Sequence, residues 1–205
     1  YIDMYLIHSP EPGEESFLQA WKGLEAAVDA GKIRTIGVSN FDVEHLDALL
    51  RNCRIKPAVN QIESHPFFAH EVLRSQTIER GIQIEAYSPM AQGAALEREE
   101  IKAIASKHNK TPAQVLLRWG LQLGNIILPK SLTKHRIEAN AQLFDFELDN
   151  DDMDVLNGLD EGMKMGKLGP PGTSAPASPG ATRPGSRRGS GSAGLAGNKL
   201  QMSSS

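Results

Sequence analysis

The stretch YIDMYLIHSP (residues 1–10) decides the fold class because it joins an apolar run to a polar end. Ile2, Met4 and Leu6 belong to the run, which only Asp3 interrupts before His8. Runs of this kind are typical of a strand covered on both faces, as in a parallel sheet wrapped by helices. Such a strand needs neighbours on both sides, and none precedes it here. We therefore expect the chain to be the C-terminal part of a longer polypeptide.

Four similar runs follow, each separated from the next by a segment with helical features. They read RTIGVSN (34–40), AVNQIES (58–64), QIEAYSP (83–89) and NIILPKS (125–131). Between and after them we predict helices at 16–30, beyond Asp42, at 70–80, from Pro112 onward, at 134–143 and at 151–159. Ser16 with Gln19 predicts a capping box, and Thr111 before Pro112 predicts a capped helix start. Alternation of strands and helices indicates a parallel sheet with crossover helices.

Polar residues gather at the carboxyl end of each predicted strand. Periodicity alone leaves an open doubly wound sheet as an alternative, but in a (β/α)8 barrel the active site is built from these strand ends. Such barrels take about 250 residues, so five of eight units need roughly 160. We therefore predict an α/β fold of the TIM-barrel type, present as an incomplete barrel of about five units over residues 1–162. The strand-end residues are His8, Ser39, Asn40, Gln61, Ser64, Tyr87, Ser88, Lys130 and Ser131.

Composition divides the chain in two and excludes several classes of function. Residues 163–205 are rich in Gly, Ser and Pro and carry six basic and no acidic residues, so we expect a disordered basic tail. The body before it is acidic, which gives no reason to expect nucleic-acid binding. A single cysteine, Cys53, excludes an internal disulfide, and no apolar stretch approaches the roughly 18 residues of a membrane span. We expect a cytoplasmic protein, and the oligomeric state stays open.

Five motifs in order resemble the second half of an aldo-keto reductase. They are YIDMYLIHSP, GKIRTIGVSNF, NQIESHP, YSPM and LPKS, the last followed by Arg136 and Asn140. The resemblance covers residues 1–162 and implies strands four to eight of a (β/α)8 barrel. It also implies an enzyme that reduces aldehydes or ketones, a small-molecule carbonyl substrate, with NADPH and without a metal.

The resemblance also implies roles for particular residues in binding NADPH/NADP+. Ser39, Asn40 and Gln61 match positions that bind the nicotinamide amide, and Tyr87 matches a ring that stacks on the nicotinamide. A further group, with the cationic and hydroxyl side chains that suit a phosphate, matches positions at the 2′-phosphate and adenine. That group comprises Lys130, Ser131, Arg136 and Asn140; Ala139 stands where the family often has glutamate.

His8 matches the catalytic histidine that orients the carbonyl by hydrogen bonding. Ser9 replaces a common tryptophan, which implies a wider substrate pocket. The family's general-acid tyrosine, its lysine and its aspartate come from the first half of the barrel, so we expect this chain to be inactive alone. Two alternatives stay open, namely a non-catalytic NADPH-binding regulatory protein of the same family and an unrelated phosphate-binding barrel enzyme.

Overall fold

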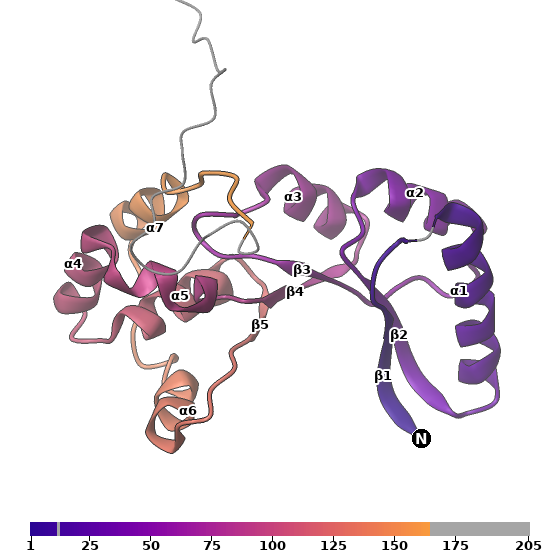
Figure 1. Cartoon of the computed structure of the whole chain (residues 1–205), viewed down its shortest axis with the longest axis horizontal. Helices are drawn as coiled ribbons and strands as arrows, with labels where there is room; N and C mark the ends of the chain where they lie inside the picture. Colours follow the sequence, from indigo (N-terminus) through magenta and orange to yellow (C-terminus); the bar gives the residue numbers. More distant parts are fainter. Residues whose placement is uncertain (12, 165–205) are drawn as a thin grey trace, which may run out of the picture. The chain divides into compact units, whose positions relative to one another are not determined.

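The computed structural model describes residues 1–11 and 13–164, and the predicted tail from residue 165 onward lies outside the described residues. The described strands form one parallel sheet in chain order, so each strand pairs with the next along the chain (Figure 1). This arrangement confirms the predicted α/β fold with crossover helices. The strands are β1 (Ile2–Ile7), β2 (Ile33–Ser39), β3 (Val59–Glu63), β4 (Gln83–Tyr87) and β5 (Ile126–Leu128).

Helices connect successive strands and continue after the last one. Three sequence-based expectations have clear outcomes: Asp42 and Thr111 cap helices as predicted, whereas the capping box at Ser16 is wrong. Helix α1 begins earlier, at Glu14, so Ser16 lies inside it. The elements are α1 (Glu14–Asp29), α2 (Val43–Asn52), α3 (Glu71–Glu79), the 3-10 helix η1 (Ala91–Glu97), α4 (Glu99–Lys107), α5 (Pro112–Gln122), α6 (Lys134–Ala141) and α7 (Asn150–Asn157).

Two apolar clusters hold the helices against the sheet and against one another. The first packs α1 and α2 onto β2 and includes Trp21, Ile36 and Leu46. The second joins α4, α5 and α7 and includes Trp119 and Leu156. Burial of large aromatic and aliphatic side chains is the main favourable contribution to folding, so these clusters fix where the strand ends lie.

Strand β1 differs from the prediction that it is covered on both faces. Four large side chains at this end of the chain are exposed, namely Tyr1, Ile2, Met4 and Tyr5, and the exposed fraction of Tyr1 is 82%. The reason is that β1 is an edge strand of the described sheet and pairs only with β2. An apolar edge strand with free backbone groups is a surface on which another strand can pair.

Residues that pair across neighbouring parallel strands point to the same face of the sheet. Ser39 pairs with Gln61, which pairs with Glu85, and this row carries polar side chains. Gly37 lies on the same face, where a Cβ atom would come within 2.6 Å of Val59 Cγ2. The strand ends therefore project polar groups together from one tightly packed face of the sheet.

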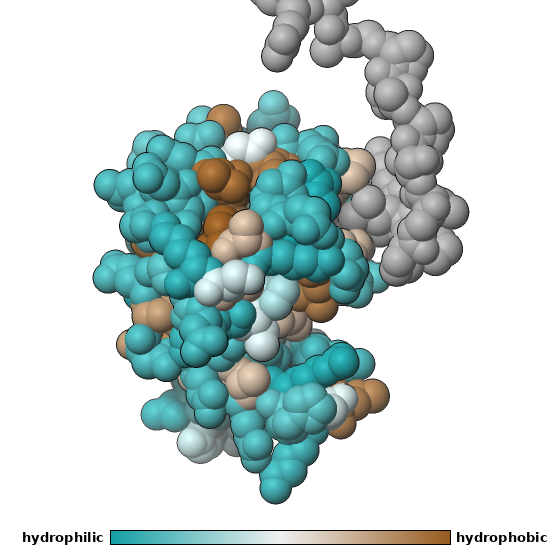
Figure 2. Space-filling view, turned by 90° about the vertical axis from the view of Figure 1, so that its left-hand side faces the viewer, coloured by the Kyte–Doolittle hydropathy of each residue, from teal (hydrophilic) through white to brown (hydrophobic). Residues whose placement is uncertain are grey.

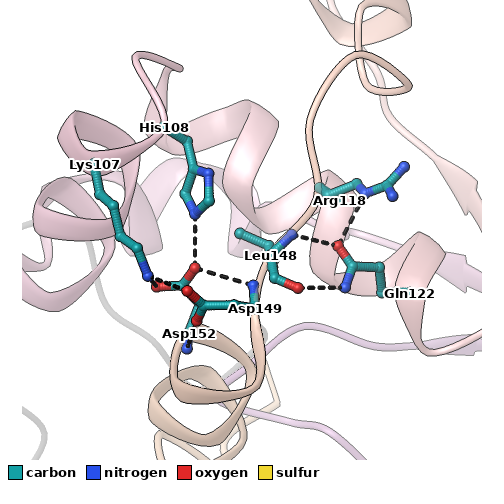
Figure 3. Close-up of polar contacts among 7 residues, drawn as sticks. All are labelled: Lys107, His108, Arg118, Gln122, Leu148, Asp149 and Asp152. Carbon is teal, nitrogen blue, oxygen red and sulfur yellow. Dashed lines mark hydrogen bonds and ion pairs between the residues drawn. The ribbon is translucent and has the colours of Figure 1, made fainter.

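Helix α7 contacts the end of α4 through a charged cluster of four residues, Lys107, His108, Asp149 and Asp152 (Figure 3). His108 Nε2 lies 2.6 Å from Asp152 Oδ2, and Lys107 Nζ lies 2.9 Å from Asp152 Oδ1. Burial alone raises the pKa of Asp152, but hydrogen bonds from His108 and Lys107 outweigh it, so the pKa lies below its ordinary value. We call these four residues the α4–α7 cluster.

The segment before α7 is held by a side-chain amide that acts like a neighbouring strand. Gln122 Oε1 accepts from the Leu148 N–H at 2.7 Å, and Gln122 Nε2 donates to the Leu148 carbonyl at 2.9 Å. Arg118 Nε donates to the same Gln122 oxygen (Figure 3). These bonds satisfy buried backbone groups in a segment without regular structure.

Acid should weaken the α4–α7 cluster. Hydrogen bonds from Lys107 and from the Asp152 backbone lower the pKa of Asp149 to about 2. Because the folded-state pKa lies below the unfolded one, this contribution is fully present above about pH 4 and is lost as the pH falls toward about 2. We therefore expect Asp149→Asn to lower the free energy of unfolding near neutral pH, by an amount that shrinks as the pH falls through about 2. Urea unfolding at several pH values measures this, and a penalty independent of pH would contradict it.

The surface on the side of α4, α6 and α7 is mainly hydrophilic, with a narrow strip of apolar residues in its upper part (Figure 2). Among the described residues, no helix has the length and apolar character needed to cross a membrane.

Candidate functional site

The carboxyl ends of β1, β2 and β4 meet in a small network of hydrogen bonds around Asn40. The Asn40 Nδ2 group donates to the His8 carbonyl and to Ser39 Oγ, both at 3.0 Å. Ser39 Oγ in turn donates to the Gln61 carbonyl at 2.8 Å. Asn40 has a φ of 60°, in the left-handed region that asparagine tolerates better than most residues. The structure thus brings together Ser39 and Asn40 by their side chains and His8 and Gln61 by their backbone carbonyls.

Tyr87 joins this network from the end of β4. Its hydroxyl donates to Asn40 Oδ1 at 3.0 Å. Burial raises the pKa of Tyr87, and the negative charge of Glu63 raises it further. The hydroxyl therefore stays protonated at neutral pH and acts as a donor to Asn40.

Two carboxylates on the same face of the sheet were missed in the sequence analysis. Glu85 accepts from Gln61 Nε2 at 2.9 Å, and Glu63 lies 3.2 Å from Nε2 of the fully buried His65. Glu63 and Glu85 are 5% and 9% exposed, so this face holds buried negative charge close to Tyr87. For Glu63 a signal was present, because it follows Gln61 along β3 at the period of a strand.

The remaining predicted residues line a cavity of about 820 Å³ beyond the end of β5. Lys130 and Ser131 follow β5, while Arg136 and Asn140 lie on α6. Ser88, which follows Tyr87 of the Asn40 network along the chain, lines the same cavity. Further lining of the cavity comes from η1, α4 and the start of α5. Its lining there includes Gln92, Gly93, Leu96, Glu97, Lys102 and Thr111.

The cavity carries positive charge that the described residues do not neutralise. No ion pair within residues 1–11 and 13–164 reaches Lys130 or Arg136, whereas Lys102, which also lines the cavity, pairs with Glu97 and with Glu99, each at 3.1 Å. Helix α6 also begins without a side-chain cap, since Thr133 makes no capping hydrogen bond. A helix start with free N–H groups beside two unpaired cations favours an anion, phosphate above all.

The described part of the chain contains no group of three or more His, Cys, Asp and Glu side chains arranged to hold a metal ion.

Comparison with known proteins places these observations in a family. The sequence profile described as "Aldo/keto reductase family" matches residues 1–161. The chain is 49% identical over 166 residues to the glyoxal reductase of Bacillus subtilis (strain 168), covering 81% of this chain and 59% of that protein. The chain thus spans about three fifths of the length of this relative.

Solved structures give the same result. A mutant of Gox0644 in complex with NADPH matches with a TM-score of 0.75 at 41% identity, covering 84% of this chain and 64% of that one. The aldose reductase of Schistosoma japonicum matches with a TM-score of 0.75 at 38% identity, covering 82% of this chain and 61% of that one. The sequence motifs of this chain, its parallel sheet and its relatives all indicate one family. This chain belongs to the aldo/keto reductase family.

Proposed function

We propose that this chain supplies the NADPH-binding side of an aldo-keto reductase that reduces aldehyde or ketone groups to alcohols. The observation that carries the proposal is the cavity with two unpaired cations, Lys130 and Arg136, on the same chain as the Asn40 network. The 2′-phosphate of NADPH would lie between these cations and Ser131, and Asn140 would contact the adenine. A relative at 41% identity has been solved with NADPH.

The strand-end residues fit the nicotinamide end of the cofactor. Gln61 uses its amide N–H on Glu85, and no hydrogen bond from a described residue reaches its Oε1, which is free to accept from a carboxamide. Asn40 Oδ1 is occupied by the Tyr87 hydroxyl. Binding of a carboxamide at Asn40 would therefore replace that hydrogen bond, and the Tyr87 ring would then be available to stack on the nicotinamide.

When bound, NADPH supplies a hydride to the carbonyl carbon. His8 is exposed directly after β1, and Asn40 fixes its backbone through the His8 carbonyl. From this position the imidazole would donate a hydrogen bond to the substrate oxygen and orient it. The buried Glu63 and Glu85 place negative charge on the same face of the sheet. Tyr87 is a poor proton donor because its pKa is raised and Asn40 accepts from its hydroxyl.

A chimera tests the reaction. The part of the Bacillus subtilis glyoxal reductase that this chain does not match would be fused to the chain, and the fall in NADPH absorbance would be followed with glyoxal. We expect turnover, and His8→Ala should lower kcat by about a hundredfold or more, the usual contribution of a positioned acid–base or electrostatic group. A chimera that binds NADPH and reduces no carbonyl compound would contradict the enzymatic proposal.

That contradicting result would support the second candidate function, a regulatory protein of the same family that binds NADPH without catalysis. The general-acid tyrosine implied by the family resemblance has no counterpart that we can assign in this chain.

A further inference from the structure

A buried carboxylate contacts the side chain that is expected to bind the nicotinamide amide. Glu85 lies on β4, is 9% exposed, and accepts a hydrogen bond from Gln61 Nε2 at 2.9 Å. The two residues pair in register across β3 and β4, so both side chains point to the same face of the sheet. Family resemblance assigned Gln61 to the nicotinamide amide and assigned nothing to Glu85.

We propose that Glu85 is a positioning residue, which fixes the orientation of the Gln61 amide and so makes the site specific for a ring that carries a carboxamide N–H. The inference rests on the proposed function, since it needs the nicotinamide ring at these strand ends. It goes beyond that function because it names the residue that decides which end of the Gln61 amide faces the cofactor.

The orientation follows from the hydrogen-bonding capacity of the two side chains. An ionised carboxylate only accepts hydrogen bonds, whereas a primary amide has a donor end and an acceptor end. Glu85 therefore holds the NH2 end of Gln61, because the opposite orientation would bring two acceptor oxygens together. A hydrogen bond to a charged group is stronger than a neutral one, and burial strengthens it further, so the flipped orientation is costly.

Gln61 Oε1 is then the acceptor that the hydrogen-bond network leaves for the cofactor. No hydrogen bond from a described residue reaches this oxygen. At Asn40, by contrast, Nδ2 donates to the His8 carbonyl and to Ser39 Oγ, and Oδ1 accepts from the hydroxyl of Tyr87. A carboxamide N–H can therefore bind Gln61 without breaking a hydrogen bond, whereas at Asn40 Oδ1 it would replace one.

A cofactor analogue without carboxamide N–H groups isolates this contact. In the 3-acetylpyridine analogue of NADP+, a methyl ketone replaces the carboxamide, so the ring keeps its carbonyl acceptor and loses both N–H donors. The adenine, the riboses and all the phosphates are the same in the two compounds. A difference in affinity between them therefore reports on the nicotinamide end alone. Loss of one hydrogen bond that leaves a protein acceptor without a partner weakens binding about five- to tenfold.

The test is a calorimetric titration of the full chain with NADP+ and with its 3-acetylpyridine analogue. The unmodified chain should bind NADP+ about five- to tenfold more tightly than the analogue. In Glu85→Gln, the group beside Gln61 can donate as well as accept, so it no longer selects one orientation. We expect the preference for NADP+ to fall to about twofold or less in this variant.

A double variant that combines Gln61→Glu with Glu85→Gln exchanges the two groups. The amide at position 85 would then donate to the carboxylate at position 61, which presents only acceptor oxygens to the cofactor. We therefore expect the double variant to regain a preference for NADP+ of about fivefold or more.

Glu25→Gln is the matched control, because Glu25 is a similarly buried carboxylate, at 8% exposed, that lies on α1. It accepts from the backbone N–H groups of Arg54 and Ile55, at 2.6 and 2.7 Å, and makes no contact with the proposed nicotinamide site. This variant should keep the preference of the unmodified chain.

The preference, and not the affinity alone, separates positioning from a structural role. A structural role would weaken binding of both compounds equally, and an unchanged preference in Glu85→Gln would therefore overturn the inference. The absence of a preference in the unmodified chain, or a folded double variant that does not regain it, would also overturn the inference. In each case binding of NADP+ by the unmodified chain leaves the proposed function standing. Failure of that chain to bind either NADP+ or NADPH would overturn the proposed function, and the inference with it.

Discussion

Replacing Arg136 with alanine should weaken NADPH binding by about 10- to 150-fold and leave NADH binding nearly unchanged. A charge-assisted hydrogen bond from a guanidinium to phosphate contributes about 1.5–3 kcal/mol, which corresponds to this range. Arg136 lines the cavity and has no ion pair with a described residue, so its charge is available to an anion. Titration of the variant with both cofactors measures the effect.

Arg51→Ala is the matched control for this prediction. Arg51 is an exposed residue near the end of α2, outside the cavity lining, and its loss changes the net charge by the same amount. It should leave the affinity for NADPH within about twofold of the unmodified chain, because exposed charges farther apart than a Debye length of about 8 Å are largely screened. Equal losses in the two variants would mean that Arg136 acts through net charge alone.

Replacing Trp119 with alanine should lower the free energy of unfolding by about 3–5 kcal/mol. Trp119 is 1% exposed and belongs to the cluster that joins α4, α5 and α7. Removing the indole would leave a large cavity at the point where these helices meet, and the surrounding backbone can close it only in part. Urea unfolding followed by circular dichroism measures the loss.

Two companion variants separate packing from hydrogen bonding at this position. Trp119 Nε1 donates to Asn157 Oδ1 at 2.9 Å, and Asn157 is exposed. Asn157→Ala should therefore cost about 1 kcal/mol or less, since water can replace the lost partner. The loss in the free energy of unfolding for Trp119→Phe should lie between the losses for Asn157→Ala and Trp119→Ala. If Trp119→Ala costs no more than Asn157→Ala, the account of this cluster is wrong.

Much of the fold could be predicted from local patterns. Apolar runs ending in polar residues located all five strands of the described sheet, and the proline after Thr111 located the start of α5. Helix α4 was missed because neither a capping side chain nor a proline marks its start, at which Arg98 makes no capping bond. The start of α1 was misplaced for a related reason, since Gly13 precedes it without a side-chain cap.

The candidate site was predictable as a set of residues but not as an arrangement. Motif resemblance named Asn40, Tyr87 and Arg136, yet one sequence does not show that Tyr87 donates to Asn40 while Arg136 lies in the cavity. The carboxylate of Glu85 was missed because its importance depends on Gln61 of the neighbouring strand. Such contacts arise from packing between distant segments, which local periodicity does not encode.

The central claim is that this chain holds a site for the phosphorylated nicotinamide cofactor, and an equilibrium titration of the unmodified chain with NADPH and NADH tests it most directly. The account predicts saturable binding of NADPH at one site, with NADH weaker by about tenfold or more, because only NADPH carries the 2′-phosphate that the unpaired cations can bind. Equal affinity for the two cofactors, or no binding of NADPH by a chain whose circular dichroism shows it folded, would contradict the account.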